Sequence, residues 1–444
     1  MIRTLIGELA KHVGETVSIS GWVDVRRDQG KMVFFDFRDR SGMVQAICLP
    51  NRPEALAEGK MLRSEYVVRV EGIVNKRPEK NIQAGKVNGD IELEIKKIEV
   101  LSPAASLPFE LTADLNLDTY LDNMPLTLRT PLARGVFNIQ ATVVSAFRES
   151  LHGQGFTEFQ APALVGADAE GGAASFAVDY YYGKKAFLAT SPQLYKQIMV
   201  GTLERVFATP KVFRGEKHAT TRHLSEYTSL DFELGFITDH TEVMAVLEKT
   251  IRAMVSAVVT KHANLFTARS IELPLVSKAS FPILKLREAQ KILGVGQDPD
   301  LEPEHERQIC EWAKKEHGSD FVFITHYPVS KRPFYTYEDE SDPGFTKSFD
   351  LLFRGLEITT GGQRIHNYEK LIERAKAKGL DPEKFSFYLQ AFKYGMPPHG
   401  GSATGLERFT ARMLNLPNVK EATLFPRDLN RIDILLHESD TLEN

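Results

Sequence analysis

The segment best suited to chemistry runs from Phe213 to Tyr227 and reads FRGEKHATTRHLSEY. Its two arginines, Arg214 and Arg222, lie between apolar runs that predict strands, so a strand–loop–strand hairpin would aim both into one cleft. The planar guanidinium of arginine makes bidentate, charged hydrogen bonds to phosphate. Because the chain has no Walker-type or dinucleotide glycine loop, side chains would have to hold any phosphates. Taken alone, the segment also has the composition of a solvated charged hairpin.

Two carboxylates form a second candidate site. Asp350 and Glu357 flank an apolar stretch that predicts buried strand, and Mg²⁺ prefers a few carboxylates together with phosphate oxygens. The pair Gly361 and Gly362 follows, and glycine would let the backbone approach a ligand closely. Paired carboxylates are also common on ordinary surfaces, so this segment alone does not decide between the two interpretations.

A third segment, Gly400–Arg408, reads GGSATGLER. It predicts a glycine-rich turn that runs into a helix, where Arg408 in the first turn would reach a nucleotide. A single glycine-rich turn before a helix is weak support for a binding site.

The first hundred residues supply a candidate binding module. Clusters of β-branched and aromatic residues alternate with turn signals and predict five short strands, which suits a small closed barrel of the OB-fold type. We expect domain boundaries at 1–104 for this barrel, 105–131 for a linker and 132–444 for a catalytic domain. The predicted strands are Thr16–Val23, Met32–Phe37, Met43–Cys48, Tyr66–Val74 and Ile91–Val100.

The remaining chain predicts an α+β domain. Apolar residues at steps of three and four indicate a long helix from Leu132 to Leu151. Strands beyond it outnumber simple βαβ alternations, which favours an antiparallel sheet flanked by helices. Its clearest elements are the strands Ser229–Phe236, Phe321–His326, Ser348–Phe353 and Leu356–Thr359 and the helices Asp239–Lys261, Pro303–His317 and Gly405–Leu414.

Composition narrows the class of protein. The 444 residues are 42% hydrophobic and 26% charged, which is ordinary globular composition. The net charge of −4 excludes a globally basic nucleic-acid coat, although not a local basic patch. Two distant cysteines, Cys48 and Cys310, argue against a disulfide framework or a zinc cluster. With no signal peptide and no apolar run of about 20 residues, we expect a soluble, cytoplasmic protein without a membrane span.

Taken together and in this order, the segments resemble the aspartyl-tRNA synthetases, a family of class II aminoacyl-tRNA synthetases. The resemblance covers essentially the whole chain. It implies an aspartate–tRNA ligase that joins L-aspartate to ATP as aspartyl-adenylate and transfers the aspartyl group to the 3′ end of tRNA(Asp). The matching segments are the long helix with Gly155–Pro162, Phe213–Glu216 with Arg222–Leu224, Gly405–Arg408, Ser191–Gln197, Gly361–Arg364 and Met396–Gly401.

The resemblance implies an ATP site built on positive charge. Arg214 matches the arginine that holds the α-phosphate and the substrate carboxylate, and Arg222 and Arg408 match those that hold the triphosphate tail. Such a site works by positioning and by electrostatic stabilisation rather than through a general base. The other implied contacts are Glu216 near adenine, His223 and Leu224 on the returning strand, Tyr227 stacked on adenine, and Asp350, Glu357 and Thr360 at the Mg²⁺.

The resemblance also implies a pocket for a short carboxylate. Lys196 and Arg364 match the pair that holds the aspartate side chain, with Asp231 supporting the lysine. Asparagine would leave these cations without a counter-ion, which is unfavourable for buried charges. The residues that match those around the substrate α-amino group are Glu170, Ser191 and Gln193.

The barrel resembles the anticodon-binding domain of the family. Phe34 matches the aromatic residue that stacks on the central anticodon base, with filling of the barrel core as the alternative. Arg27, Gln45 and Glu92 match polar readers of base edges.

Other expectations concern partners and rival functions. The first-motif helix builds a two-fold interface in the family that the chain resembles, so the resemblance implies a homodimer. The catalytic half is most similar to compact enzymes that also charge tRNA(Asn), so we expect both tRNAs as substrates and keep strict tRNA(Asp) charging as the alternative. The rivals are an asparaginyl-tRNA synthetase and a non-catalytic RNA-binding paralogue. The stretch Ser330–Lys347 is interpreted as a loop on the substrate side, and Ser402 and Ala403 depart from the family pattern.

Overall fold

The structure is a computed structural model, and it describes residues 2–85, 87–166, 174–217 and 220–436. The chain divides into two compact units, Met1–Ala113 and Asp114–Asn444. Each unit has its own hydrophobic core, and each is described by itself.

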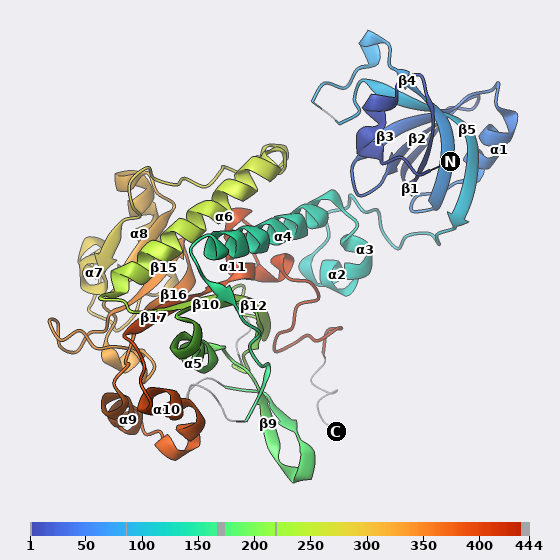
Figure 1. Cartoon of the computed structure of the whole chain (residues 1–444). Helices are drawn as coiled ribbons and strands as arrows, with labels where there is room; N and C mark the ends of the chain where they lie inside the picture. The colour runs from blue at the N-terminus through green and yellow to red at the C-terminus, as the bar shows by residue number, and fades with distance from the viewer. Residues whose placement is uncertain (1, 86, 167–173, 218–219, 437–444) are drawn as a thin grey trace. The chain divides into compact units, whose positions relative to one another are not determined.

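The first unit is a closed five-stranded barrel with strand order β1-β2-β3-β5-β4 (Figure 1). The alternating pattern of β2 turns Phe35 and Phe37 into the core, while Phe34 and Asp36 remain on the outer face. The predicted barrel is therefore confirmed. Its elements are β1 (Thr16–Asp28), β2 (Val33–Arg38), β3 (Met43–Cys48), α1 (Pro53–Met61), β4 (Val67–Lys76) and β5 (Ile91–Ser102).

The predicted linker 105–131 contains two short helices, α2 (Leu117–Asp122) and α3 (Met124–Thr127). Asn116 caps α2 by accepting the amide hydrogen of Thr119. Arg431 forms ion pairs with Asp118 and Asp122, which ties α2 to the C-terminal part of the chain. The second half of that segment thus belongs to the second unit, and the boundary between the units lies at Ala113.

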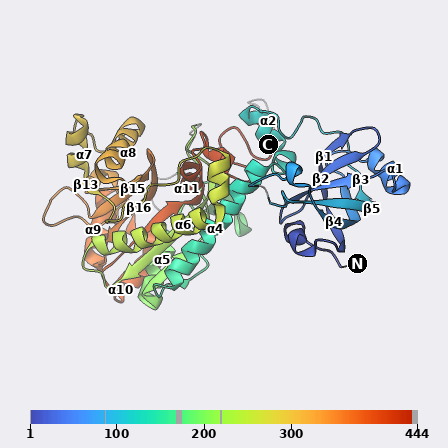
Figure 2. The ribbon, with the colours of Figure 1, turned by 90° about the horizontal axis from the view of Figure 1, so that it is seen from above.

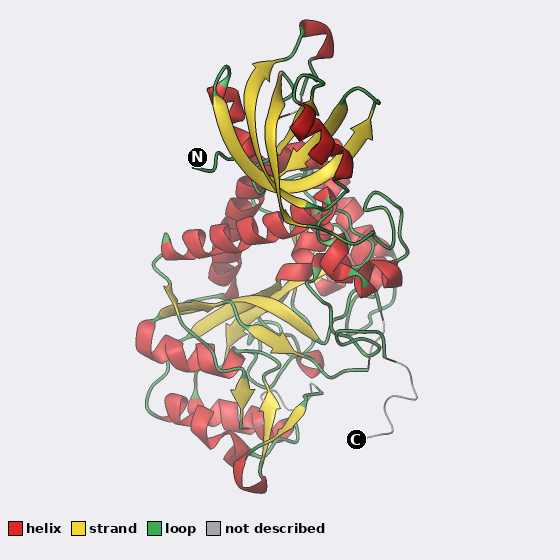
Figure 3. Cartoon of the chain, turned by 90° about the vertical axis from the view of Figure 1, so that its right-hand side faces the viewer, coloured by secondary structure: helices red, strands yellow, loops and turns green. Residues whose placement is uncertain are grey.

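The second unit is built on a sheet with the order β13-β14-β15-β16-β17-β12-β10-β6. The pairs from β14 to β10 are antiparallel, as expected, whereas β13 with β14 and β6 with β10 are parallel at the two ends. Figure 3 shows these strands in yellow. Their bounds are β6 (Thr157–Glu158), β10 (Arg205–Ala208), β12 (Glu226–Gly235), β13 (Ile283–Lys285), β14 (Phe321–Thr325), β15 (Ser348–Phe353), β16 (Leu356–Arg364) and β17 (His399–Gly405), with β11 (Lys211–Phe213) paired to β12.

Two long helices, α4 (Pro131–His152) and α6 (His240–Ala268), lie side by side across one face of this sheet (Figures 1 and 2). Their apolar stripes pack on Leu230, Phe232 and Leu234 of β12 and form the main core. The other helices are α5 (Gln193–Leu203), α7 (Leu286–Leu293), α8 (Pro303–His317), α9 (Tyr368–Ala377), α10 (Ser386–Lys393) and α11 (Leu406–Met413). A separate small sheet has the order β7 (Leu164–Val165), β9 (Lys185–Leu188) and β8 (Ala177–Asp179).

The opposite face of the sheet carries polar side chains. Residues alternate along β12, so Ser229, Asp231 and Glu233 point away from the core residues between them. Helix α5 packs against β10 and β12, and α8 packs against β14 and its neighbours. The polar face of the central strands therefore lies between these two helices.

The glycine-rich segment Gly400–Gly405 corrects the sequence prediction, because it is the central strand β17 and not a turn. Glycine is normally depleted in strands, which is why the pattern favoured a turn. A Cβ on Gly401 would lie 2.2 Å from Oε2 of Glu233 and 2.1 Å from the carbonyl oxygen of Phe232. Glycine is needed here because a buried carboxylate occupies the space of a side chain.

Both cysteines are buried free thiols. Burial raises the pKa of Cys48 and that of Cys310 to about 12 in each case, so neither is a reactive thiolate at neutral pH. Among the helices that the structure describes, none has the length and apolar character needed to cross a membrane.

Candidate active site

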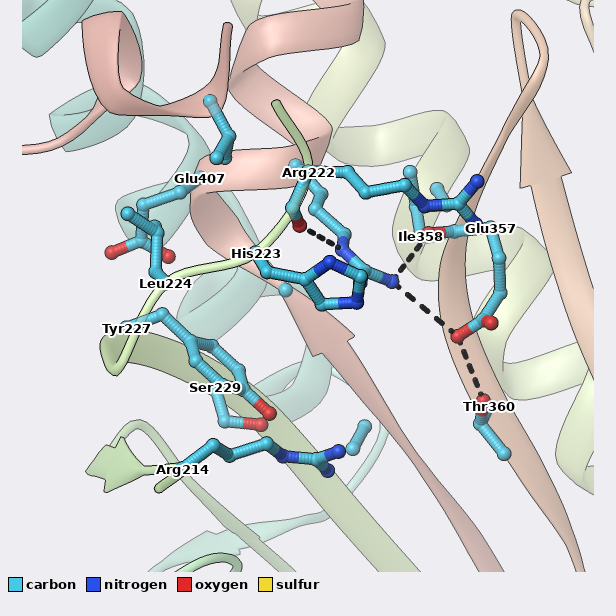
Figure 4. Close-up of a pocket in the computed structure, with 14 residues that line it drawn as sticks. Arg214, Arg222, His223, Leu224, Tyr227, Ser229, Glu357, Ile358, Thr360 and Glu407 are labelled. Atoms are coloured by element: carbon cyan, nitrogen blue, oxygen red, sulfur yellow. Dashed lines mark hydrogen bonds and ion pairs between the residues drawn. The ribbon is translucent and has the colours of Figure 1, made fainter. Parts of the chain in front are cut away.

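A pocket that is partly open to solvent lies on the polar face of the sheet (Figure 4). Its walls come from the β11–β12 hairpin, β16, β17 and the start of α11. It brings together most of the predicted ATP-binding residues, namely Arg214, Arg222, His223, Leu224, Tyr227, Glu357, Thr360 and Arg408.

The hairpin positions the first arginine as the sequence predicts. Strands β11 and β12 pair in an antiparallel manner, with Phe213 opposite Glu226. The amide of Arg214 donates to the carbonyl oxygen of Ser225 at 2.8 Å. Its guanidinium carbon lies 6.0 Å from the centre of the Tyr227 ring, and both side chains face the pocket in Figure 4.

The other two arginines meet around Glu357 on β16. Arg408 donates from Nη1 to the carbonyl oxygen of Glu357 at 3.1 Å and from Nε to that of Arg222 at 3.2 Å. The Glu357 carboxylate accepts the Thr360 hydroxyl at 3.1 Å and lies 3.7 Å from Arg408. Residues from three distant segments thus form one positively charged wall.

Asp350 does not line this pocket but lies beside it, opposite Thr360 in the β15–β16 register. Its Oδ2 accepts a hydrogen bond from Nη2 of Arg332 at 2.8 Å, while its buried Oδ1 has no hydrogen-bond partner. Burial and the nearby charge of Glu357 raise the pKa of Asp350 to about 6. Two carboxylates close enough to affect each other's charge, one of them with an unsatisfied oxygen, are a donor set that fits a hard divalent cation such as Mg²⁺.

One predicted ATP-site residue is not placed as expected. Glu216 lies on the hairpin loop but not among the residues that line the pocket. His223 lines it, and its Nδ1 lies 2.6 Å from the hydroxyl of Thr220. Glu170, predicted near the substrate amino group, lies outside the described residues.

A second, fully buried cluster surrounds Lys196 on α5. Its ammonium lies 3.0 Å from Oδ1 of Asp231 and 3.2 Å from Oε2 of Glu233, and it donates to the carbonyl oxygen of Ser402 at 3.1 Å. The predicted Lys196–Asp231 ion pair is therefore present. These three acceptors match the three donors of an ammonium group.

Arg364, at the end of β16, lies in the same cluster. It donates from Nε to Oε1 of Glu233 at 2.9 Å and from Nη2 to the carbonyl oxygen of Gly401 at 2.9 Å. Nη2 also contacts Oε1 of Gln193 at 3.3 Å. The Ser191 hydroxyl accepts the amide hydrogen of Gln193 at 3.1 Å, so both predicted amino-group residues lie at the start of α5.

Glu233 is the residue that the sequence analysis missed. Burial opposes its ionisation, but the charges of Arg364 and Lys196 lower the pKa of Glu233 below its ordinary value. The cluster thus holds two cations and two carboxylates before any substrate binds. The expectation that asparagine would leave Lys196 and Arg364 without counter-ions is wrong, because Asp231 and Glu233 already balance them.

The cluster and the pocket share the same strands. Ser229 lines the pocket, and Asp231 and Glu233 follow it on the same face of β12. Ala403 also lines the pocket and pairs with Asp231 across β12 and β17. A small molecule in contact with both regions would span neighbouring positions of one sheet face.

The glycine pair Gly361–Gly362 does not open a path to a ligand. A Cβ on Gly361 would meet the Phe349 ring at 2.4 Å, and one on Gly362 would meet the carbonyl oxygen of Lys347 at 2.7 Å. The pair therefore allows close packing of β16 against neighbouring chain segments. The stretch Ser330–Lys347 lies beside the cluster, where Tyr335 packs 5.6 Å from the guanidinium carbon of Arg364.

The barrel unit has its own polar face. Phe34 is partly exposed, so it does not fill the core as the alternative supposed. It pairs across β1 and β2 with Arg27, which donates to Asp36 at 2.8 and 3.1 Å. A cleft beside them contains Arg27, Asp36 and Gln45. Glu92 lies on β5 of the same barrel, where it is opposite Asn75 of β4.

Comparison with known proteins agrees with both units. A family described as "tRNA synthetases class II (D, K and N)" matches residues 116–429, and one described as "OB-fold nucleic acid binding domain" matches residues 17–101. The chain is 45% identical to an aspartate–tRNA(Asp/Asn) ligase of Thermus thermophilus, over 97% of this chain and 100% of that protein. It is 40% identical to an aspartate–tRNA(Asp) ligase of Thermococcus kodakarensis, over 94% and 96%.

Solved structures give the same architecture. An asparaginyl-tRNA synthetase from Pyrococcus horikoshii, complexed with asparaginyl-adenylate, superposes with a TM-score of 0.89 at 31% identity and covers 97% of this chain and 99% of its own. An aspartyl-tRNA synthetase from Entamoeba histolytica superposes with a TM-score of 0.86 at 29% identity, covering 97% and 93%. The chain belongs to the class II tRNA synthetases of the D, K and N group, alongside the aspartate–tRNA ligases.

Proposed function

We propose that this protein is an aspartate–tRNA ligase that makes aspartyl-adenylate from L-aspartate and ATP and transfers the aspartyl group to the 3′ end of tRNA. One observation carries the proposal: the buried cluster of Lys196 and Arg364 adjoins an arginine-lined pocket on the same strands. A small diacid held by the cluster would present its α-carboxylate to a nucleotide in the pocket.

The pocket suits the first step, attack of the substrate carboxylate on the α-phosphate of ATP. Two negatively charged reactants must be held together, which requires positioning and fixed positive charge. Arg214 would contact the α-phosphate and the attacking carboxylate, and Arg222 and Arg408 the remaining phosphates. Tyr227 lies beside Arg214, where its ring can pack against adenine.

We further propose that Asp350 and Glu357, with Thr360 beside them, hold Mg²⁺. The unsatisfied Oδ1 of Asp350 and the raised pKa of its carboxyl support this role. Bound Mg²⁺ would offset the charge of phosphate oxygens. Arg332, which contacts the other oxygen of Asp350, already supplies part of that positive charge.

The substrate amino acid follows from the buried cluster. Arg364 offers a planar guanidinium, the group best suited to a carboxylate, and Lys196 keeps the cluster neutral against Asp231 and Glu233. Asparaginyl-tRNA synthetases share this fold, so fold alone does not choose the substrate. The decisive experiment is ATP–pyrophosphate exchange: we expect exchange with aspartate and none with asparagine. A non-catalytic RNA-binding protein would show neither.

The barrel is proposed to bind the anticodon through Phe34, Arg27, Gln45 and Glu92. The contact with Asp36 raises the pKa of Arg27, chiefly through their hydrogen bond, so the guanidinium stays charged and held at the strand surface. A partly exposed aromatic ring beside this pair provides a stacking platform for a base.

Phe34→Ala is expected to raise the Michaelis constant for tRNA about tenfold or more and to leave ATP–pyrophosphate exchange intact. Base–aromatic stacking contributes about 1–3 kcal/mol, and 1.4 kcal/mol corresponds to a factor of ten. Steady-state aminoacylation and exchange assays measure the two quantities separately. Equal losses in both assays would instead indicate that Phe34 has a packing role.

We propose that tRNA(Asn) is a substrate together with tRNA(Asp). The relative from Thermus thermophilus is an aspartate–tRNA(Asp/Asn) ligase at 45% identity, whereas the 40%-identical relative from Thermococcus kodakarensis is named for tRNA(Asp) alone. Charging of each purified tRNA with radioactive aspartate tests this. Charging of tRNA(Asp) without detectable charging of tRNA(Asn) would contradict the broader substrate range and leave the ligase assignment intact.

We also propose that the protein acts as a cytoplasmic homodimer. Helix α4 carries a shallow groove lined by Phe137, Ala141 and Val144, and β6 forms an edge of the sheet. A partly apolar groove beside a strand edge is suited to pairing with a second copy. Sedimentation equilibrium should give twice the chain mass of 49.9 kDa, and a monomer mass would contradict the dimer.

A further inference from the structure

Glu306 lies on α8, outside every segment to which the sequence analysis assigned a role in binding or catalysis, yet its carboxylate reaches the wall of the ATP pocket. Its side chain is only 7% exposed. Oε1 accepts a hydrogen bond from Nη2 of Arg222 at 2.7 Å, and Oε2 accepts the amide hydrogen of Glu357 at 3.0 Å. One buried carboxylate therefore joins the hairpin arginine to the strand that carries the proposed metal ligand.

The contacts of Arg408 close this arrangement into a ring. Arg408 donates to the backbone carbonyls of both Arg222 and Glu357. Burial raises the pKa of Glu306, and the charge of Arg222 opposes that rise. If Arg222 turned away, Glu306 would lose the cation that contacts it directly in a buried position, which is strongly unfavourable. The Arg222 side chain is thus held in one orientation on the pocket wall.

We propose that Glu306 is a positioning residue that fixes the guanidinium of Arg222 for the phosphates of ATP, an inference that rests on the proposed function. An arginine on a loop has many rotamers, and fixing one of them costs conformational entropy. Because the contact with Glu306 already selects one rotamer, less entropy is lost when ATP binds. The guanidinium has five N–H donors in a fixed fork. The contact through Nη2 occupies only part of that fork, so the rest can bind phosphate.

Glu306→Gln tests the proposal because it keeps the size of the side chain and an acceptor for the Glu357 amide but removes the charge that holds Arg222. We expect the KM for ATP in aspartate-dependent pyrophosphate exchange to rise about tenfold. The KM for aspartate should change less than twofold, because Glu306 has no contact with the Lys196 cluster. The melting temperature of each variant is measured alongside.

Glu304→Gln is the matched control. Glu304 lies on the same helix, is half exposed and pairs with Arg307, away from the pocket. It should leave both KM values unchanged. Unchanged KM for ATP in Glu306→Gln, or an equal rise in both KM values, would overturn the positioning role. Absence of exchange in the unmodified enzyme would instead count against the proposed function itself.

A double-mutant cycle with Arg222→Ala distinguishes positioning of Arg222 from a purely structural role of Glu306. If Glu306 acts through Arg222, Glu306→Gln should raise the KM for ATP no further once Arg222 is alanine. Additive effects of the two changes would contradict the proposal. Should Glu306→Gln fail to fold, Glu306→Asp keeps the charge but withdraws it from Arg222, and the same selective rise in the KM for ATP is expected.

Discussion

Lys196→Leu is expected to lower aspartate-dependent ATP–pyrophosphate exchange by a factor of about 10²–10³ or more. The side chain is buried and contacts two carboxylates that are themselves completely buried. Removing one partner of a buried ion pair costs about 3–5 kcal/mol of stability. A loss of this size in the binding of the substrate carboxylate would correspond to the expected factor, because about 1.4 kcal/mol is a factor of ten. Near-normal exchange in this variant would overturn the assignment of the aspartate pocket.

The charge of the cluster explains why Lys196→Leu is expected to weaken binding of the substrate as well as to lower the stability of the protein. With Lys196 present, two cations balance Asp231 and Glu233. With leucine in its place, the cluster carries one excess negative charge in a position shielded from water. A substrate side chain that is itself a carboxylate would then be repelled where it must bind.

Because the variant is also expected to be less stable, a second variant separates folding from function. Asp231→Asn combined with Lys196→Leu removes one charge of each sign and leaves Arg364 balanced by Glu233. We expect this double variant to regain most of the melting temperature but not the exchange activity. Recovery of both would show that Lys196 serves the fold and not the substrate.

The ATP site was predictable from sequence to the extent that its chemistry is local. Arg214 and Arg222 lie in one hairpin, which the apolar runs on either side predict, and the structure pairs Phe213 with Glu226 in it. Helix α8 and strand β15 were predicted with their observed bounds, Pro303–His317 and Ser348–Phe353, because each has a strong period or a clear apolar run.

The residues that were missed depend on contacts between distant segments. Glu233 did have a signal: Ser229, Asp231 and Glu233 alternate with Leu230, Phe232 and Leu234, a period of two that places all three polar residues on one face. Glu306 had a weaker signal: it lies three, four and seven positions before Ile309, Cys310 and Ala313, on the buried stripe of α8. A glutamate at such a position is normally expected at the surface, and its burial, unlike the exposure of Glu304, depends on the packing of α8 against the sheet.

The glycine-rich strand β17 shows a third reason why the sequence alone did not predict the whole site. Glycine predicts a turn when only local preference is considered. In the fold, Gly401 leaves room for the Glu233 carboxylate and accepts a hydrogen bond from Arg364 through its carbonyl oxygen. The sequence feature that looked like a loop is therefore a consequence of the buried charges, and it can be interpreted only once those charges are placed.

Arg364→Lys is expected to raise the KM for aspartate about 10- to 100-fold and to leave the KM for ATP nearly unchanged. Lysine keeps the positive charge and the balance with Glu233, so the change removes only the planar fork. That fork now contacts Glu233, Gly401 and Gln193 with well-defined geometry. Hydrogen bonds to charged groups contribute about 1.5–3 kcal/mol each, which sets the expected range.

Arg354→Lys is the matched control for this last prediction, because Arg354 is also a largely buried arginine whose Nε contacts a buried carboxylate, that of Asp320 at 2.9 Å. It should lower the melting temperature by a similar amount without a selective effect on aspartate. If Arg364→Lys raises the KM values for aspartate and ATP together, or leaves both unchanged, then charge alone holds the substrate and the guanidinium geometry has no special role. A selective rise for aspartate would show that the cluster recognises the two acceptor oxygens of a carboxylate. Asparagine has nearly the same shape but offers one acceptor and one amide donor, so the guanidinium fork separates the two substrates in a pocket that is already neutral.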